Sequence, residues 1–211
     1  TQIDPIVFTG MDVLLGSPGD RPISLWAEMF VPMTLRDAIR EVTIANAEGV
    51  EVPLVMDERV VVPSTREAEP LRADSWFWRY LALGSVAGGL LAWIGARATT
   101  GARLFRVLFG TLASAWSLLA GLSGLILVLV LLTDHWSMTF NESLFLLNPV
   151  SLPLVALVPL ALRGSLASAR RARMLGFVAL GVAALGLLFQ LLPVTPQETG
   201  MLFALLLPIH I

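Results

Sequence analysis

The polar side chains that could do chemistry in the apolar half of this chain gather in one short stretch, residues 133–148. The candidates are Asp134, His135, Asn141, Glu142 and Asn148. A His near a carboxylate can act as a general base, because the carboxylate orients the imidazole and stabilises its charged form. Adjacent side chains on a helix do not face each other, so a carboxylate for His135 would come from Glu142 or from another segment. The alternative is that Asp134-His135-Trp136 is a hydrated cap at a helix end.

The second histidine, His210, follows an apolar run that starts near Met201. If that run enters a membrane at its start, His210 lies about 13 Å further along the helix axis. An ionisable residue at that depth is a functional candidate by default. A haem or chlorin ligand is conceivable, but two histidines at different depths do not suit bis-His ligation, and His210 could equally face a packed core. We therefore predict no cofactor, and His210 is the residue considered for one.

Several kinds of chemistry are excluded by composition. All 14 basic residues are Arg, and the sequence has no Cys. The chain therefore has no thiol nucleophile, no disulfide, no Cys-ligated metal and no Schiff-base lysine. It also has no GxSxG or HExxH motif. We predict no catalytic residue and no metal site in this chain, and the net charge of -2 argues against a nucleic-acid partner.

The distribution of charge divides the chain in two. Residues 1–75 hold 13 acids against six Arg, a net charge of -7, whereas residues 76–211 hold eight Arg against three acids, a net charge of +5. With 56% hydrophobic and 14% charged residues overall, the apolar content exceeds what one soluble core can hide. This division predicts a water-exposed segment at 1–75 and a membrane domain at 76–211.

The first segment has the pattern of a small α+β domain. Thr34-Leu35-Arg36-Asp37 has the form of a capping box before a helix of about 35–41. Strands are expected at 42–44 and 50–55 around a turn at 46–49, with a possible third at 59–62. A segment of about 75 residues makes a marginal core. We therefore expect it to be the end of a larger domain.

From Trp76 onward, bilayer thickness sets the element lengths. A hydrocarbon layer of about 30 Å needs about 20 helical residues per crossing, and four segments qualify. They are 76–96, 107–133, 149–169 and 174–193. A fifth starts near Met201 but is too short to cross, so we expect it to be incomplete. The prediction is an α-helical membrane bundle of about five transmembrane helices, preceded by a small α+β extracytoplasmic segment.

Prolines mark the third of these segments as unusual. We expect its helix to begin at Pro149 with Asn148 as its cap, to kink at Pro159, and to follow an interfacial or re-entrant piece at 140–147. Non-helical backbone at membrane depth survives only where protein or water satisfies it. This reasoning again marks the 134–148 loop as a candidate site.

Arginines in the loops orient the bundle. The 97–106 and 163–173 loops carry seven Arg, and residues 134–148 and 194–200 carry none. Because Arg-rich short loops stay on the cytoplasmic side, we expect the 1–75 segment and the 134–148 loop to lie outside the cytoplasmic membrane. Trp76, Trp78, Tyr80 and Trp136 would form an aromatic belt at that outer surface.

Two stretches resemble a known family. The first runs from Gly10-Met11-Asp12 through Gly16-Ser17-Pro18-Gly19-Asp20 to Trp26-Ala27-Glu28-Met29-Phe30-Val31-Pro32, and the second comprises Thr133-Asp134-His135, Asn141-Glu142-Ser143-Leu144 and Leu147-Asn148-Pro149. They resemble the end of the periplasmic domain and the outer membrane-domain loop of the Lnb-type bacterial inner-membrane lipoprotein N-acyltransferases. Together the two stretches frame most of residues 10–211.

That resemblance implies an enzyme that moves an acyl chain onto the N-terminal amine of a lipoprotein at the outer face of the inner membrane. It also implies a papain-like domain whose Cys nucleophile lies upstream. Because this chain has no Cys, the catalytic role does not transfer to it. The resemblance leaves Asp134, His135, Asn141, Glu142 and Asn148 as the lining of the place where a lipid substrate meets the soluble domain. Membrane lipids and a lipoprotein are the implied partners.

Two other functions stay open. The chain could be a non-catalytic integral membrane subunit that packs against a larger membrane complex. A transporter would need polar groups near the middle of the membrane, where the four crossings offer chiefly Gln190 with Ser and Thr.

Overall fold

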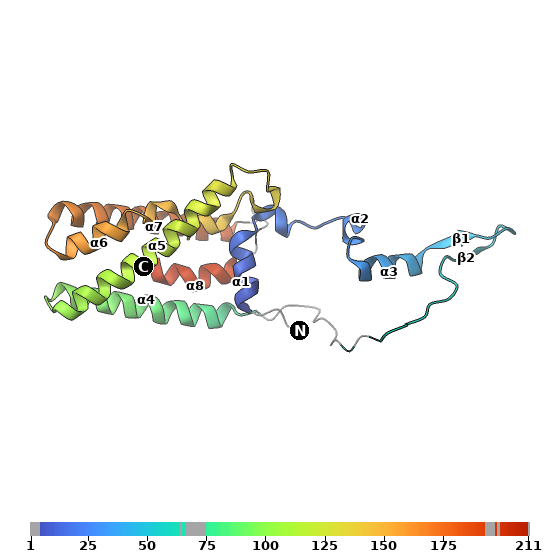
Figure 1. The fold of residues 1–211 in the computed structure, drawn as a ribbon, viewed down its shortest axis with the longest axis horizontal. Helices are drawn as coiled ribbons and strands as arrows, with labels where there is room; N and C mark the ends of the chain where they lie inside the picture. The colour runs from blue at the N-terminus through green and yellow to red at the C-terminus, as the bar shows by residue number, and fades with distance from the viewer. Residues whose placement is uncertain (1–4, 64, 66–74, 193–196, 198, 211) are drawn as a thin grey trace. The chain divides into compact units, whose positions relative to one another are not determined.

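The computed structural model describes residues 5–63, 65, 75–192, 197 and 199–210 (Figure 1). Contacts between residues divide the chain into two units: residues 21–70, and residues 2–20 together with 71–211. The charge distribution predicted that residues 1–20 belong with the acidic segment of residues 1–75. The contacts instead group them with the helices that follow residue 75.

The unit of residues 21–70 is small and open. It contains the short helix α2 (Leu25–Glu28), the helix α3 (Pro32–Glu41) and two antiparallel strands, β1 (Thr43–Ala45) and β2 (Glu51–Pro53). Ile44 is the Cα partner of Val52 in this ladder. None of the described residues from 21 to 63 is buried, and the side chains of Trp26 and Phe30 are 77% and 86% exposed.

Two local predictions for this unit are corrected. Helix α3 begins at Pro32 rather than near Leu35, because proline suits the first helical position and Val31 makes no side-chain cap. The expected capping box at 34–37 therefore lies inside the helix. The residues at 59–62 form no strand in the described part of the chain, whereas the turn at 46–49 is confirmed, with Asn46 Oδ1 accepting the amides of Glu48 and Val50.

The second unit is built on three helices long and apolar enough to cross a membrane. They are α4 (Phe77–Thr99), α5 (Arg103–Val130) and α7 (Leu166–Leu191). At most 28% of the most apolar 18-residue window of each is buried inside the molecule. The remaining apolar surface requires lipid around it, so the chain is a helical membrane protein and contacts membrane lipids.

The third crossing expected from the sequence, at 149–169, is replaced by a bent pair. The short 3-10 helices η3 (Glu142–Phe145) and η4 (Pro149–Ser151) lead into α6 (Leu154–Leu162), and the two parts are bent by 51°. Pro159 lies inside α6 as predicted, but the helix ends after nine residues. The pair is a broken span or a re-entrant loop, so the described residues form three or four spans plus the short helix α8 (Gly200–His210).

Helix α7 begins eight residues before the predicted start at Met174. Gly164, with φ of 101°, ends the turn after α6, and the Oγ of Ser165 accepts the amide of Ser168 as the N-terminal cap of α7. Arg170, Arg171 and Arg173 therefore lie on the first two turns of a helix and not in a loop.

Helix α8 packs along α4, with two glycines at the contact (Figure 1). A Cβ at Gly84 would lie 2.2 Å from the carbonyl oxygen of Leu205, and one at Gly88 would lie 2.0 Å from that of Pro208. This is the small-xxx-small spacing that lets membrane helices approach closely. A Cβ at Gly89 would meet no atom within 4 Å, so Gly84 and Gly88 serve this contact and Gly89 does not.

The core of this unit gathers around the segment before α6. One buried cluster contains Leu146, Ala183, Leu202 and Phe203, and a second contains Ala120, Leu127 and Leu147. Val13, from the N-terminal helix α1 (Pro5–Leu14), packs against both clusters. Helix α1 is thus an integral part of the membrane unit.

Candidate functional site

The candidate site lies where α1 meets the segment between α5 and α6. Its polar side chains come from η3, from the end of α7 and from the residues before α8, which bring together positions more than 100 residues apart. The buried members are Asn141, Glu142, Ser143, Asn148, Gln197 and Thr199.

Side chains from other parts of the membrane unit donate hydrogen bonds to the backbone carbonyls at the end of α1. The last carbonyls of any helix lack intrahelical partners. Asn141 Nδ2 donates to the carbonyl oxygens of Val13 at 2.8 Å and Leu14 at 3.1 Å, and Gln197 Nε2 donates to that of Leu15 at 2.8 Å. Ser143 Oγ donates to the backbone carbonyl oxygen of Asp12 at 3.3 Å. Four successive carbonyls are therefore held by side chains of the membrane unit.

The chain just after α1 is held through its backbone as well. The amide of Gly16 donates to the carbonyl of Ser137 at 2.9 Å, and that of Ser17 donates to Phe140 at 3.3 Å. A Cβ at Gly16 would lie 1.8 Å from the carbonyl oxygen of Thr139, so only glycine fits here. Phe140 itself has φ of 49°, a left-handed conformation that is uncommon for a bulky residue.

Glu142 is the acidic centre of the network. Its backbone amide donates to Gln197 Oε1 at 2.7 Å, and its Oε2 accepts a hydrogen bond from Gln190 Nε2. The same amide nitrogen of Gln190 donates to Thr199 Oγ1 at 2.8 Å. The other carboxyl oxygen, Oε1, is buried with no hydrogen-bond partner in the described part of the chain. A buried polar group in this state is an exception in folded proteins and marks the position as unusual.

Asn148 and His210 also carry buried atoms without partners. Neither amide atom of Asn148 makes a hydrogen bond among the described residues, and it gives η4 no side-chain cap. The expected capping role of Asn148 is therefore wrong, although Pro149 does occupy the first helical position. The ring of His210 packs edge-on against Trp116 at 5.6 Å between centroids, and its Nε2 has no partner in the described residues.

The five residues predicted from the sequence separate into two environments. Asn141, Glu142 and Asn148 are each 5% exposed, whereas Asp134 and His135 lie on the exposed turn after α5. His135 Nδ1 is 2.9 Å from Thr133 Oγ1 and gives no side-chain cap to the 3-10 helix η2 (Trp136–Met138). No hydrogen bond or ion pair joins His135 to Glu142 among the described residues.

The aromatic belt expected at this end needs one correction. Trp78 and Trp136 are 76% and 69% exposed, and the guanidinium of Arg79 lies 4.5 Å from the ring centroid of Trp76, so the belt stays a prediction for these three tryptophans. Tyr80 is only 7% exposed, and its hydroxyl lies 2.6 Å from Thr9 Oγ1 on α1. Tyr80 is thus another contact that holds α1 in place.

Sequence reasoning missed the amide side chains that complete the network. Gln190 had a signal, because it is a polar residue near the end of an apolar helix. Gln197 and Thr199 follow the helix in a polar connection with no motif, and only the tertiary structure brings them to Glu142.

The hydrogen bonds of this network position α1. Asn141, Ser143 and Gln197 hold the end of α1, and the Glu142 carboxyl accepts from Gln190. No group of three or more His, Asp or Glu within the described ranges could hold a metal ion. Arginines other than Arg79 mark the opposite end of the long helices, because Arg97 lies in the last turn of α4, Arg103 begins α5 and Arg163 follows α6. In Figure 1 the turn between α4 and α5 and the turn between α6 and α7 lie at one end of the long helices, and α1 lies at the other.

The comparisons with known proteins give one result. A family model described as the Lnb transmembrane domain matches residues 85–210, more than half of the chain, and includes the broken segment and α8. No curated protein and no solved structure matches the chain. With this match, and with three or four spans around a broken segment, the chain belongs to the Lnb transmembrane domain family.

Proposed function

We propose that this chain is the membrane-embedded portion of a lipoprotein N-acyltransferase-like protein, and that its helices fix the end of a soluble acyl-transfer domain at one membrane surface. The observation that carries the proposal is the capture of four successive carbonyls, residues 12–15, by Asn141, Ser143 and Gln197. A segment that only tethered a soluble domain would not need a bond to each of these groups.

Acyl transfer from a membrane lipid to an amine explains why such fixing is useful. The reacting groups must meet at the level of the lipid headgroups, and a misplacement of 1 Å can lower the rate about 100-fold. Helix α1 is held by buried hydrogen bonds and by Val13 in the core. A soluble structure attached to α1 would therefore have a fixed position relative to the membrane.

The chain has no Cys, so on this proposal the nucleophile belongs to a part of the machinery outside these 211 residues. The exposed apolar side chains of the 21–70 unit, Trp26 and Phe30 among them, suit the edge of a larger domain. Asp134 and His135 are the exposed polar residues on the turn after α5 and are proposed to meet the lipid headgroup or the lipoprotein there.

The proposal includes an orientation in a bacterial inner membrane. The helix ends that carry Arg97, Arg103 and Arg163 face the cytoplasm, and the end with α1 faces the periplasm. Because the chain is free of Cys, single substitutions Asp134→Cys and Thr100→Cys can be labelled in intact cells with a membrane-impermeant maleimide. We expect labelling at 134 but not at 100 until the membrane is opened. The reverse result would invert the bundle and remove the proposed role.

The function is tested with Asn141→Ala in the intact protein in membranes, measuring the conversion of a diacylated lipoprotein to its N-acylated form by mass spectrometry. We expect a loss of about 10-fold or more, because two carbonyls of α1 lose their donor. Ser165→Ala is the matched control, since it also removes side-chain hydrogen bonds but at the opposite end of the bundle. It should keep its acylation activity.

Two results would count against the proposal. Equal activity of Asn141→Ala and Ser165→Ala, with α1 shown by proteolysis to be loosened, would mean that fixing α1 does not matter for transfer. No acylation at all, together with co-purification of other integral membrane proteins in fixed ratio, would favour the non-catalytic membrane subunit instead.

A further inference from the structure

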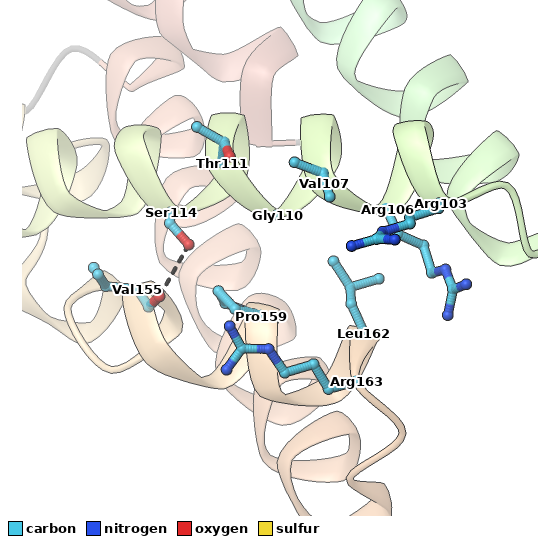
Figure 2. Close-up of a pocket in the computed structure, with 10 residues that line it drawn as sticks. All are labelled: Arg103, Arg106, Val107, Gly110, Thr111, Ser114, Val155, Pro159, Leu162 and Arg163. Atoms are coloured by element: carbon cyan, nitrogen blue, oxygen red, sulfur yellow. Dashed lines mark hydrogen bonds between the residues drawn. The ribbon is translucent and has the colours of Figure 1, made fainter.

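A second site lies at the arginine end of the membrane unit, between α5 and α6. A groove of about 840 Å³ runs between the two helices and is lined by residues of both (Figure 2). Arg103, Arg106 and Arg163 come from stretches where the sequence analysis expected cytoplasmic loops, and the other lining residues come from expected membrane helices. The residues of the buried polar network take no part in it.

The mouth of the groove is strongly basic. Arg103 and Arg106 line it from the first turn of α5, and Arg163 lines it from the end of α6. In Figure 2 Leu162 lies between them and the Arg163 side chain extends toward Pro159. Arg106 donates to the carbonyl of Gly101 at 3.1 Å. None of the three forms a salt bridge with a described residue, and the described acids of the membrane half, Asp134 and Glu142, lie at the other end.

Helix α5, which begins at the mouth, adds to the positive electrostatic potential there. Helix α5 starts at Arg103, its first turn has no acidic residue, and Ala102 gives no side-chain cap. The first amides of such a helix have no side-chain acceptor, and the helix dipole favours an anion there. A phosphate group at the mouth would supply the acceptors that α5 and the three arginines lack.

The rest of the groove is apolar and leads away from the mouth along the helices. Val107 and Leu162 flank it, Pro159 and Val155 line the α6 side, and Gly110 leaves room because it has no side chain. At the far end Ser114 Oγ donates to the carbonyl of Val155 at 2.9 Å and joins the two helices (Figure 2). A chain that entered from the mouth would meet only apolar surface until that point, apart from Thr111.

We propose that this groove binds one anionic glycerophospholipid, with its phosphate held by Arg103, Arg106 and Arg163 and an acyl chain lying between α5 and α6. A basic pocket between membrane helices at the surface is the arrangement that binds acidic lipid headgroups. The positive charge of the mouth favours an anion, and α4, α5 or α7 of a second copy of this chain would bring further arginines to it. Inorganic phosphate would satisfy the mouth but leave the apolar groove empty.

The test is native mass spectrometry of the purified full chain in detergent, titrated in turn with phosphatidylglycerol, phosphatidylcholine and inorganic phosphate. The variant Arg103→Gln/Arg106→Gln/Arg163→Gln removes the mouth. Its control, Arg170→Gln/Arg171→Gln/Arg173→Gln, removes the same charge from the same end without touching the groove. A third variant, Val107→Trp, fills the groove and changes no charge.

We expect the wild-type chain and the control triple to retain one phosphatidylglycerol. The mouth triple should bind it about 10-fold or more weakly than the control, because a hydrogen bond to a charged group is worth about a factor of ten or more. Val107→Trp should weaken it as well. The proposal would be overturned if phosphatidylcholine were retained as well as phosphatidylglycerol, or if both triple variants lost the lipid equally. It would also be overturned if inorganic phosphate alone bound as tightly as the lipid, or if the wild-type chain formed dimers that the mouth triple lacked.

Discussion

Replacing Gly16 by alanine should release helix α1 from the membrane unit. The new Cβ would lie 1.8 Å from the carbonyl oxygen and 2.8 Å from the carbonyl carbon of Thr139. These are backbone atoms, which cannot rotate away as a side chain can. Either residues 15–17 or the loop at 137–140 must move, and the hydrogen bonds from Gly16 to Ser137 and from Ser17 to Phe140 are then lost.

The size of the effect follows from these contacts. Two backbone hydrogen bonds contribute about 1 kcal/mol each, and relieving the overlap costs a further 1–3 kcal/mol, roughly. We expect α1 docking to weaken by at least about 3 kcal/mol, which is roughly a 100-fold or larger increase in the open population. The spans would stay folded, because their own packing does not include Gly16.

Hydrogen–deuterium exchange of the peptide that covers α1 measures this directly. Exchange of its amides should accelerate roughly 100-fold in Gly16→Ala, whereas peptides from α5 and α7 should be unchanged. Gly10→Ala is the matched control, because nothing lies within 4 Å of its new Cβ and alanine favours the helix. Unchanged α1 exchange in Gly16→Ala, or equal acceleration in both variants, would refute the reasoning.

Three further predictions concern other parts of the molecule. Gly88→Ala should lower the thermal stability of the membrane unit in detergent, since its Cβ meets the Pro208 carbonyl at 2.0 Å, whereas Gly89→Ala should not; equal melting of the two would rule out the α4–α8 contact. Phe140→Asn should raise stability by about 1 kcal/mol in a melting experiment, because Asn tolerates the left-handed conformation; a loss would mean that the ring anchors in lipid. The hydrogen bond from Arg40 lowers the pKa of Glu58 below its ordinary value of 4.5, so this contact stabilises the folded state above that pH and is lost as the pH falls through the lowered pKa; an NMR titration should detect the shift, and Arg40→Gln should abolish it.

Much of the membrane half could be predicted from local properties. Apolar length alone identified the helices α4, α5 and α7, because a bilayer imposes about 20 residues on any crossing. Alternation around a turn at residues 46–49 predicted the two paired strands. The polar stretch at 133–148 was recognised as unusual for the same reason: such residues are costly next to lipid.

The helix boundaries were harder, since they depend on capping. The Gly164-Ser165 pair ends one helix and starts another, and hydropathy averaged over a window does not detect it. The arginines that follow were consequently assigned to a loop.

The composition and order of residues by themselves determined a Cys-free, helical membrane chain with seven arginines in the 97–106 and 163–173 stretches and its polar candidates in one short stretch, residues 133–148. Only the tertiary structure decided that α1 belongs to the membrane unit, and that Asn141 and Gln197 are used to hold its carbonyls. The physical reason is that backbone carbonyls carry no sequence signal. Which side chain meets them depends on how segments more than 100 residues apart fold together.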